Sequence, residues 1–176
     1  EFAAEVETLL EMGYRSIELV SSQDPKLYVR QRPFDPEDQR FELTGALRYF
    51  EILNEKLTAR GGGMITSNVP PVCRRGFSQM RDAGLDCFLV WLETFDPTQY
   101  QRLHNGAGPK GNQAYRLDSF ERSLEAGVEH VAGGFLKGLH DWRREEAILY
   151  FLDRHLRDRW GRGFSIIGSP RVKGRF

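Results

Sequence analysis

Five polar side chains follow short apolar segments of this 176-residue chain, and their types could perform chemistry. They are Gln23, Asn68, Glu93, Lys137 and Arg171. A carboxylate accepts hydrogen bonds from hydroxyl and ammonium groups, and a guanidinium binds a carboxylate through two parallel hydrogen bonds. A lysine forms Schiff bases when burial lowers its pKa. The five residues therefore predict a binding site for a polar small molecule, if the fold brings them together.

The apolar segments before these residues are predicted to be β-strands. They are short and mostly continuous in hydrophobicity, as in parallel strands covered on both faces. The predicted strands span residues 15–20, 64–69, 87–91, part of 130–139, and 164–169. Helical spacing of apolar residues predicts helices at 2–12, 41–59, 74–83, 116–126 and 142–160. A further helix is predicted to begin at Asp96 and Pro97, which suit an N-cap and a first turn.

Alternation of strands and helices predicts either a parallel barrel or an open doubly wound sheet. No GxGxxG motif follows the first strand, which counts against dinucleotide binding. The five polar residues would share the carboxyl-terminal rim, where barrel enzymes carry their active sites. We expect an α/β fold, a partial parallel (β/α) barrel of about five βα units. Residues 1–176 are interpreted as one partial domain, with 26–40 as a long loop or insertion, cut from a longer protein at both ends.

Composition removes several classes of function. Lys plus Arg and Asp plus Glu both number 25, so no net charge favours nucleic acid or an anionic membrane. No apolar run approaches the roughly 20 residues of a membrane helix. Two cysteines, Cys73 and Cys87, are too few for a disulfide scaffold or a complete metal site. We expect a cytoplasmic protein whose partner is a small molecule, with no nucleic acid and no membrane.

Several motifs occur together in one order, and in combination they are informative. They are Met12-Gly13-Tyr14, Leu92-Glu93-Thr94-Phe95, Gly108-Pro109-Lys110, Phe120-Glu121-Arg122, Glu125-Ala126-Gly127, Asp141-Trp142 and Ser169-Pro170-Arg171. With these motifs the chain resembles the radical S-adenosylmethionine enzymes of the aromatic amino-acid lyase group. That group includes the tyrosine lyases of thiamine synthesis and hydrogenase maturation, and a tryptophan lyase.

The resemblance implies a reaction and its cofactors. Such enzymes reduce S-adenosylmethionine with a [4Fe-4S] cluster, and the resulting 5′-deoxyadenosyl radical fragments an aromatic amino acid or related substrate in cofactor or natural-product biosynthesis. A flavodoxin or ferredoxin supplies the electron. The cluster is held by a CxxxCxxC motif after the first barrel strand. This motif is absent from the chain, so the first cluster-binding unit and the metal ligands are expected outside it.

The resemblance also assigns roles to individual residues. Glu93 matches a glutamate that holds S-adenosylmethionine, and Arg122 an arginine suited to the carboxylate of that cofactor. Gln23 and Asn68 are weaker candidates for the same cofactor. Arg171 matches an arginine that holds the carboxylate of the amino-acid substrate. Gln23 stands where the family usually has glutamate, which indicates a divergent member.

Other interpretations stay open. Glu93 and Lys137 could serve another barrel lyase or aldolase, as acid–base and Schiff-base groups. The chain could also keep S-adenosylmethionine binding without the cluster and without catalysis. On the structural side, Glu93 could simply cap a helix, and Arg122 could be a solvated partner of a helical carboxylate.

Overall fold

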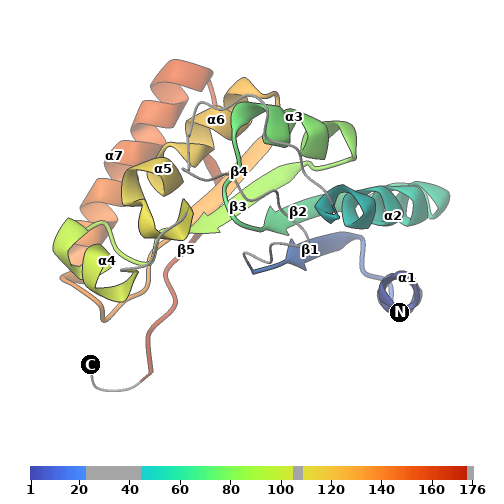
Figure 1. Cartoon of the computed structure of the whole chain (residues 1–176), viewed down its shortest axis with the longest axis horizontal. Helices are drawn as coiled ribbons and strands as arrows, with labels where there is room; N and C mark the ends of the chain where they lie inside the picture. The colour runs from blue at the N-terminus through green and yellow to red at the C-terminus, as the bar shows by residue number, and fades with distance from the viewer. Residues whose placement is uncertain (23–44, 105–108, 174–176) are drawn as a thin grey trace.

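The computed structural model describes residues 1–22, 45–104 and 109–173, and it contains a single parallel sheet. The strands are β1 (Ser16–Val20), β2 (Met64–Asn68), β3 (Cys87–Trp91), β4 (His130–Gly134) and β5 (Phe164–Gly168). They lie side by side in chain order, each parallel to its neighbour (Figure 1). This is the strand order of a section of a β/α barrel, so the expected fold class is confirmed.

The helices connect these strands and cover one face of the sheet. They are α1 (Phe2–Glu11), α2 (Ala46–Ala59), α3 (Arg74–Asp82), α4 (Pro97–Leu103), the short 3-10 helix η1 (Pro109–Gly111), α5 (Gln113–Leu117), α6 (Ser119–Glu125) and α7 (Trp142–Trp160). Helices α2, α3, α6 and α7 run along the sheet, whereas α4 and α5 gather near the carboxyl end of β3 (Figure 1).

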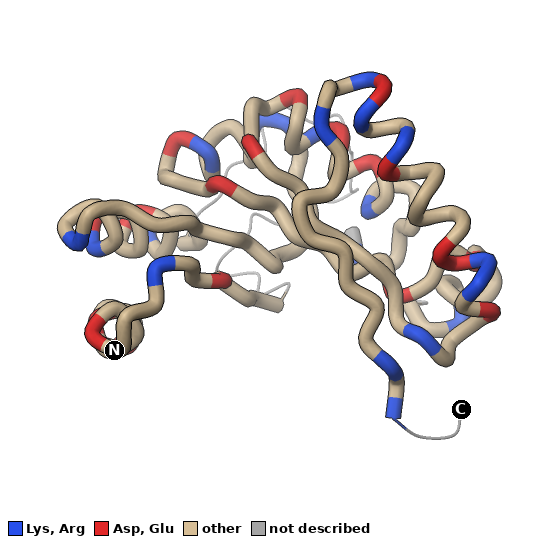
Figure 2. Tube along the Cα trace, turned by 180° about the vertical axis from the view of Figure 1, so that it is seen from behind, with Lys and Arg blue, Asp and Glu red and all other residues tan. Residues whose placement is uncertain are grey.

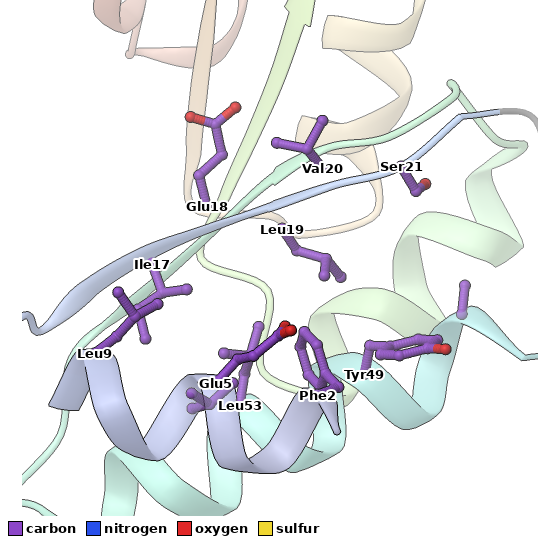
Figure 3. A pocket seen from close by; sticks show the side chains of 12 residues that line it. Phe2, Glu5, Leu9, Ile17, Glu18, Leu19, Val20, Ser21, Tyr49 and Leu53 are labelled. Atoms are coloured by element: carbon purple, nitrogen blue, oxygen red, sulfur yellow. The ribbon is translucent and has the colours of Figure 1, made fainter.

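The two faces of the sheet have different surroundings. Phe88 and Val90 of β3 belong to the main hydrophobic core beneath the helices. Cys87 and Leu89 alternate with them and form a small separate cluster with Ala132 on the opposite face. Figure 3 shows the same alternation in β1, with Glu18 on the side away from α1 and α2. In a barrel this opposite face lines the lumen.

Lysine, arginine, aspartate and glutamate residues are concentrated on the helices and loops (Figure 2). Glu18 is the one lysine, arginine, aspartate or glutamate within the five strands that the structure describes. A lone carboxylate on the lumen face of an otherwise uncharged sheet marks that face as a place for polar ligands.

Two predicted helices need correction. The helix predicted at 116–126 is two helices, because the Asn112 side chain accepts from the Tyr115 amide and starts a turn early. Asp118 then separates α5 from α6. In α7 the buried stripe runs through Glu145, Leu149 and Leu156. Apolar spacing in the sequence predicts Ala147, Phe151 and His155 on the same face as Leu156, whereas all three are exposed in the structure.

The predicted loop at 26–40 and the start of the helix predicted at 41 lie outside the described residues, and so does Gln23. Within the described ranges, no helix is long and apolar enough to cross a membrane. A pocket of about 460 Å³ opens between α1, β1 and α2 (Figure 3). Its lining includes none of the predicted site residues that the structure describes.

Candidate functional site

Three chain segments continue the order of the sheet beyond the carboxyl ends of β3, β4 and β5. The Leu136 amide donates to the Glu93 carbonyl at 2.8 Å, which joins the first segment to the second. The Lys137 amide donates to the Pro170 carbonyl at 2.8 Å, and Lys137 and Arg171 form a parallel bridge. The backbone thus brings Glu93, Lys137 and Arg171 to one rim, as the sequence predicts.

Asn68 ends β2 at the same edge of the sheet but has a partner of its own. Its side-chain amide donates to the Glu18 carboxylate, with 3.0 Å between Nδ2 and Oε1. Glu18 lies one strand away on the lumen face and was not singled out from the sequence. The sequence does contain a signal for Glu18, because it is a charged residue in the middle of an otherwise apolar strand, at an inward position. Asn68 and Glu18 together form a polar pair at the β1–β2 end of the lumen.

Glu93 adopts an unusual backbone conformation two residues beyond β3. Its φ is +65°, which makes it the one residue other than glycine with positive φ among the described residues. Its side chain is 18% exposed and lies 3.9 Å from the Lys110 ammonium group. Lys110 is itself held in place, because the buried Tyr100 hydroxyl donates to the Lys110 carbonyl at 2.6 Å. Burial raises the pKa of Tyr100 to about 12, so this hydroxyl keeps its proton at neutral pH.

Arg116 is a buried cation beside this region that the sequence analysis overlooked. It is 7% exposed, and its Nη2 group donates to the Trp91 carbonyl. Its Nε atom is buried without a hydrogen-bond partner. Burial lowers the pKa of Arg116, and the nearby Tyr100 and Glu93 oppose that shift. A buried guanidinium with a free donor and a nearby carboxylate can receive an anionic group of a ligand.

Arg122 has a different environment from the one its sequence neighbours suggest. It pairs with Asp118 at 2.5 Å and donates to the carbonyls of Val72 and Tyr115, at 3.2 and 2.8 Å. Its guanidinium also stacks over the Tyr115 ring, 3.8 Å from the ring centre. The helical i, i+4 ion pair of the structural interpretation is present, but the Arg122 side chain is only 12% exposed and is therefore not a solvated surface group. These contacts tie α6 to neighbouring segments and leave few donors for a ligand.

Lys137 and Arg171 differ in their side-chain contacts. The Lys137 ammonium lies 2.7 Å from Glu146 and 5.1 Å from the Trp142 ring centre. Schiff-base lysines are activated by apolar pockets or by neighbouring cations, whereas this one faces a carboxylate. The environment of Lys137 therefore gives the aldolase alternative no support. Arg171 is exposed on the rim.

Trp91 forms part of the lumen surface just below this rim. A Cβ atom added at Gly168 would come within 2.2 Å of the indole, and one added at Gly134 within 2.9 Å. The side chain therefore extends from β3 across Gly134 of β4 to Gly168 of β5, two positions without a side chain. Absence of a Cβ at both glycines makes room for the ring.

The cysteines do not fit a metal centre. Cys73 and Cys87 are both buried, and burial raises the pKa of Cys87 to about 11, which disfavours the thiolate that binds iron. No group of three potential metal ligands occurs among the residues that the structure describes. The described residues therefore do not fit a [4Fe-4S] cluster. Glu93 and Arg116 do fit the donors and the carboxylate of S-adenosylmethionine.

Comparison with known proteins finds relatives in both sequence and fold. Residues of this chain are 28% identical over 110 positions to 2-iminoacetate synthase of Escherichia coli, covering 62% of this chain and 27% of that protein. The resemblance to the radical S-adenosylmethionine lyases is confirmed. The chain spans about a quarter of the length of this curated relative. No protein-family model matches the chain.

Solved structures agree on the fold. The [FeFe]-hydrogenase maturase HydG of Carboxydothermus hydrogenoformans is similar with a TM-score of 0.76 and 25% identity, over 98% of this chain and 36% of that one. Another crystal structure of this maturase gives a TM-score of 0.79 at 23% identity, over 99% of this chain and 36% of that one. The chain therefore has the fold of about a third of these larger enzymes.

Proposed function

We propose that this chain is part of a radical S-adenosylmethionine lyase and carries much of its cofactor-binding rim. Residues 1–176 would form a single partial barrel domain of the parent protein. The observation that carries the proposal is the buried, incompletely bonded Arg116 at the end of β3, whose charge feels the nearby Glu93 carboxylate. Similarity to 2-iminoacetate synthase over 62% of this chain supports the proposed class of enzyme.

The residues of this chain would act by binding and orienting ligands. Glu93 would accept hydrogen bonds from the ammonium group or the ribose hydroxyls of S-adenosylmethionine. Arg116 would bind the carboxylate of that cofactor, and its free Nε is the donor that makes it a better candidate than Arg122. Asn68 and Gln23 remain weaker candidates for the same cofactor. Arg171, exposed on the rim, would bind the carboxylate of an aromatic amino acid.

The remaining parts of the reaction belong to the whole protein. In the parent protein, a [4Fe-4S] cluster would supply the electron for the radical chemistry of S-adenosylmethionine. The cluster would be held by cysteines of the parent outside this chain. A flavodoxin or ferredoxin in the cytoplasm would deliver the electron.

Binding and turnover by the full-length parent protein test the proposal. The protein is reconstituted with iron and sulfide under anaerobic conditions, and S-adenosylmethionine binding is measured by calorimetry for the wild type and for Glu93→Gln. We expect about a tenfold or larger rise in Kd, because the glutamine loses the charge that strengthens hydrogen bonds to ammonium. Lys173→Gln, on the same rim segment as Arg171, serves as the control.

Turnover separates the proposal from its alternative. Formation of 5′-deoxyadenosine from S-adenosylmethionine, with tyrosine or tryptophan present, would support the lyase. Binding without 5′-deoxyadenosine would instead support a protein that keeps the cofactor site without catalysis. Unchanged binding in Glu93→Gln would reject the assignment of Glu93.

A further inference from the structure

The backbone at Glu93 is in a conformation that a residue with a side chain rarely adopts. Its φ of +65° lies in the left-handed region, where the Cβ atom approaches its own carbonyl oxygen. Such conformations persist only where surrounding contacts hold them, and they occur often at functional sites. The contacts around Glu93 therefore identify what keeps it in place.

A buried carboxylate from another element makes the main side-chain contacts with this turn. Glu145 lies in the first turn of α7 and is 2% exposed. One of its oxygens accepts from the Thr94 hydroxyl at 2.5 Å, and the other accepts from the Phe95 amide at 2.7 Å. Both donors lie within two residues of Glu93, so Glu145 fixes the chain immediately after the left-handed residue.

Further hydrogen bonds fix the same turn from other sides. The Leu136 amide donates to the Glu93 carbonyl at 2.8 Å, and the Gln113 side chain donates to the Thr94 carbonyl at 2.9 Å. Thr94 is fully buried. Apart from Thr94, the polar groups that face Glu145 are the Phe95 amide and the His140 ring, whose Nδ1 is 3.7 Å away.

These contacts suit a carboxylate. The Phe95 amide can only donate, and the Thr94 hydroxyl donates its proton to Glu145 while it accepts from the Asp96 amide at 3.1 Å. Each carboxylate oxygen of Glu145 therefore has a donor from which to accept. Glutamine accepts through one oxygen only, so the Thr94 hydroxyl would have to turn its proton away and accept from the NH₂ group instead.

We propose that Glu145 is a positioning residue, whose buried carboxylate holds the Glu93–Thr94 turn in the left-handed conformation that directs Glu93 toward Lys110. The inference rests on the proposed function, because the ligand of Glu93 is taken to be S-adenosylmethionine. Without Glu145 the turn samples ordinary conformations, and only a fraction of molecules present the Glu93 carboxylate correctly. The apparent affinity falls in proportion to that fraction.

A double-mutant cycle in the full-length, reconstituted protein tests the inference. The variants are Glu145→Gln, Glu93→Gln and the pair, and the matched control is Glu146→Gln. Glu146 is the next residue of α7, and its carboxylate pairs with Lys137 rather than with the turn. The Kd for S-adenosylmethionine is measured by calorimetry, and hydrogen exchange is followed in a peptide that contains residues 92–97.

If Glu145 acts through Glu93, Glu145→Gln raises the Kd about tenfold, as expected when a tenth of molecules keep the competent turn. In the Glu93→Gln background the same change adds less than about twofold, because the residue being positioned is already lost. Exchange in residues 92–97 becomes faster in Glu145→Gln and stays unchanged in Glu146→Gln.

Two results would overturn the inference: unchanged exchange in residues 92–97 of Glu145→Gln, or a Kd penalty that persists in full in the Glu93→Gln background. The second result would make Glu145 a purely structural residue. A different result marks failure of the proposed function alone. If Glu93→Gln binds normally while Glu145→Gln loosens the turn, Glu145 holds the turn but Glu93 is not the cofactor ligand.

Discussion

Glu93 and Arg171 lie on the same rim, but the protein holds them in different ways. Around Glu93 the chain provides a buried carboxylate, backbone hydrogen bonds and two nearby cations, and the side chain is 18% exposed. At Arg171 the residues that the structure describes provide a backbone bridge to Lys137, and the side chain is exposed. The geometry of Glu93 is therefore fixed within this chain. The geometry of the Arg171 side chain depends instead on whichever groups contact its exposed guanidinium.

This difference agrees with the proposed roles of the two residues, Glu93 in binding the cofactor and Arg171 in binding the substrate. A group that binds the same cofactor in every turnover benefits from a rigid position, because no ordering cost remains when the ligand arrives. A group that binds the substrate can be adjusted by other parts of the site. Substitutions that loosen the fixed region should therefore have larger effects than substitutions at the rim near Arg171.

The largest effect on stability should come from Arg122, which is fixed but not in contact with the rim. Arg122→Met removes hydrogen bonds to the carbonyls of Val72 and Tyr115, and should lower the free energy of unfolding by about 3 kcal/mol. Urea unfolding of the full-length protein measures it. Arg154→Met is the matched control, because Arg154 forms an exposed pair with Asp158 that contributes below about 0.5 kcal/mol. Equal losses in the two variants would contradict a structural role for Arg122.

Arg116→Met should show the opposite pattern. Removal of the guanidinium should raise the Kd for S-adenosylmethionine about 100-fold, by loss of charge-assisted hydrogen bonds to the carboxylate of the cofactor. Stability should change by less than about 1 kcal/mol, because the substitution also removes a buried, incompletely bonded cation. Calorimetry and urea unfolding on the same protein give both numbers. If Arg116→Met loses much stability but binds S-adenosylmethionine normally, Arg116 is the structural residue and Arg122 becomes the candidate for cofactor binding.

Gly168→Ala tests the lumen surface between Glu93 and Arg171. The added Cβ would lie 2.2 Å from the Trp91 indole, so the ring must move, at a cost of about 2 kcal/mol in unfolding free energy. Trp91→Leu should restore much of that loss when combined with Gly168→Ala, because a smaller side chain leaves room for the methyl group. No recovery in the double variant would show that strain in β5 itself, rather than contact with Trp91, causes the loss.

The sequence predicted the fold well, for a physical reason. Short apolar strands such as Cys87–Trp91 and a long amphipathic helix at 142–160 carry strong local signals, and their alternation restricts the topology. The ends of the predicted strands then placed Glu93 and Arg171 on the rim, and the resemblance assigned their roles. The helix boundaries were harder to predict, because Asp118 divides two helices where apolar spacing predicted one.

The missed residues depend on contacts between distant parts of the chain. From the sequence, Arg116 cannot be distinguished from a surface arginine. In the folded chain it is buried beneath the end of β3. Glu145 is separated by 51 positions from Thr94, and only the packing of α7 brings them together. Local spacing contains no information on either contact. The positive φ of Glu93 accompanies both a local hydrogen bond, from the Thr94 amide to the Leu92 carbonyl, and the long-range contact of Thr94 with Glu145. Residue types alone do not predict it.

The smallest predicted effect tests the backbone conformation of Glu93 directly. The difference in stability between the glycine and alanine variants should have opposite signs at Glu93 and at a helical control position. At φ +65°, glycine has no Cβ to clash, so Glu93→Gly should be more stable than Glu93→Ala by about 1 kcal/mol. In the helix interior at Glu146 the order should reverse, with glycine less stable than alanine by about 1 kcal/mol. Urea unfolding of the four variants measures both differences. If alanine is the more stable residue at both positions, the turn at Glu93 is not held in the left-handed conformation in solution. The fixed region of the rim would then be no more ordered than the surroundings of Arg171.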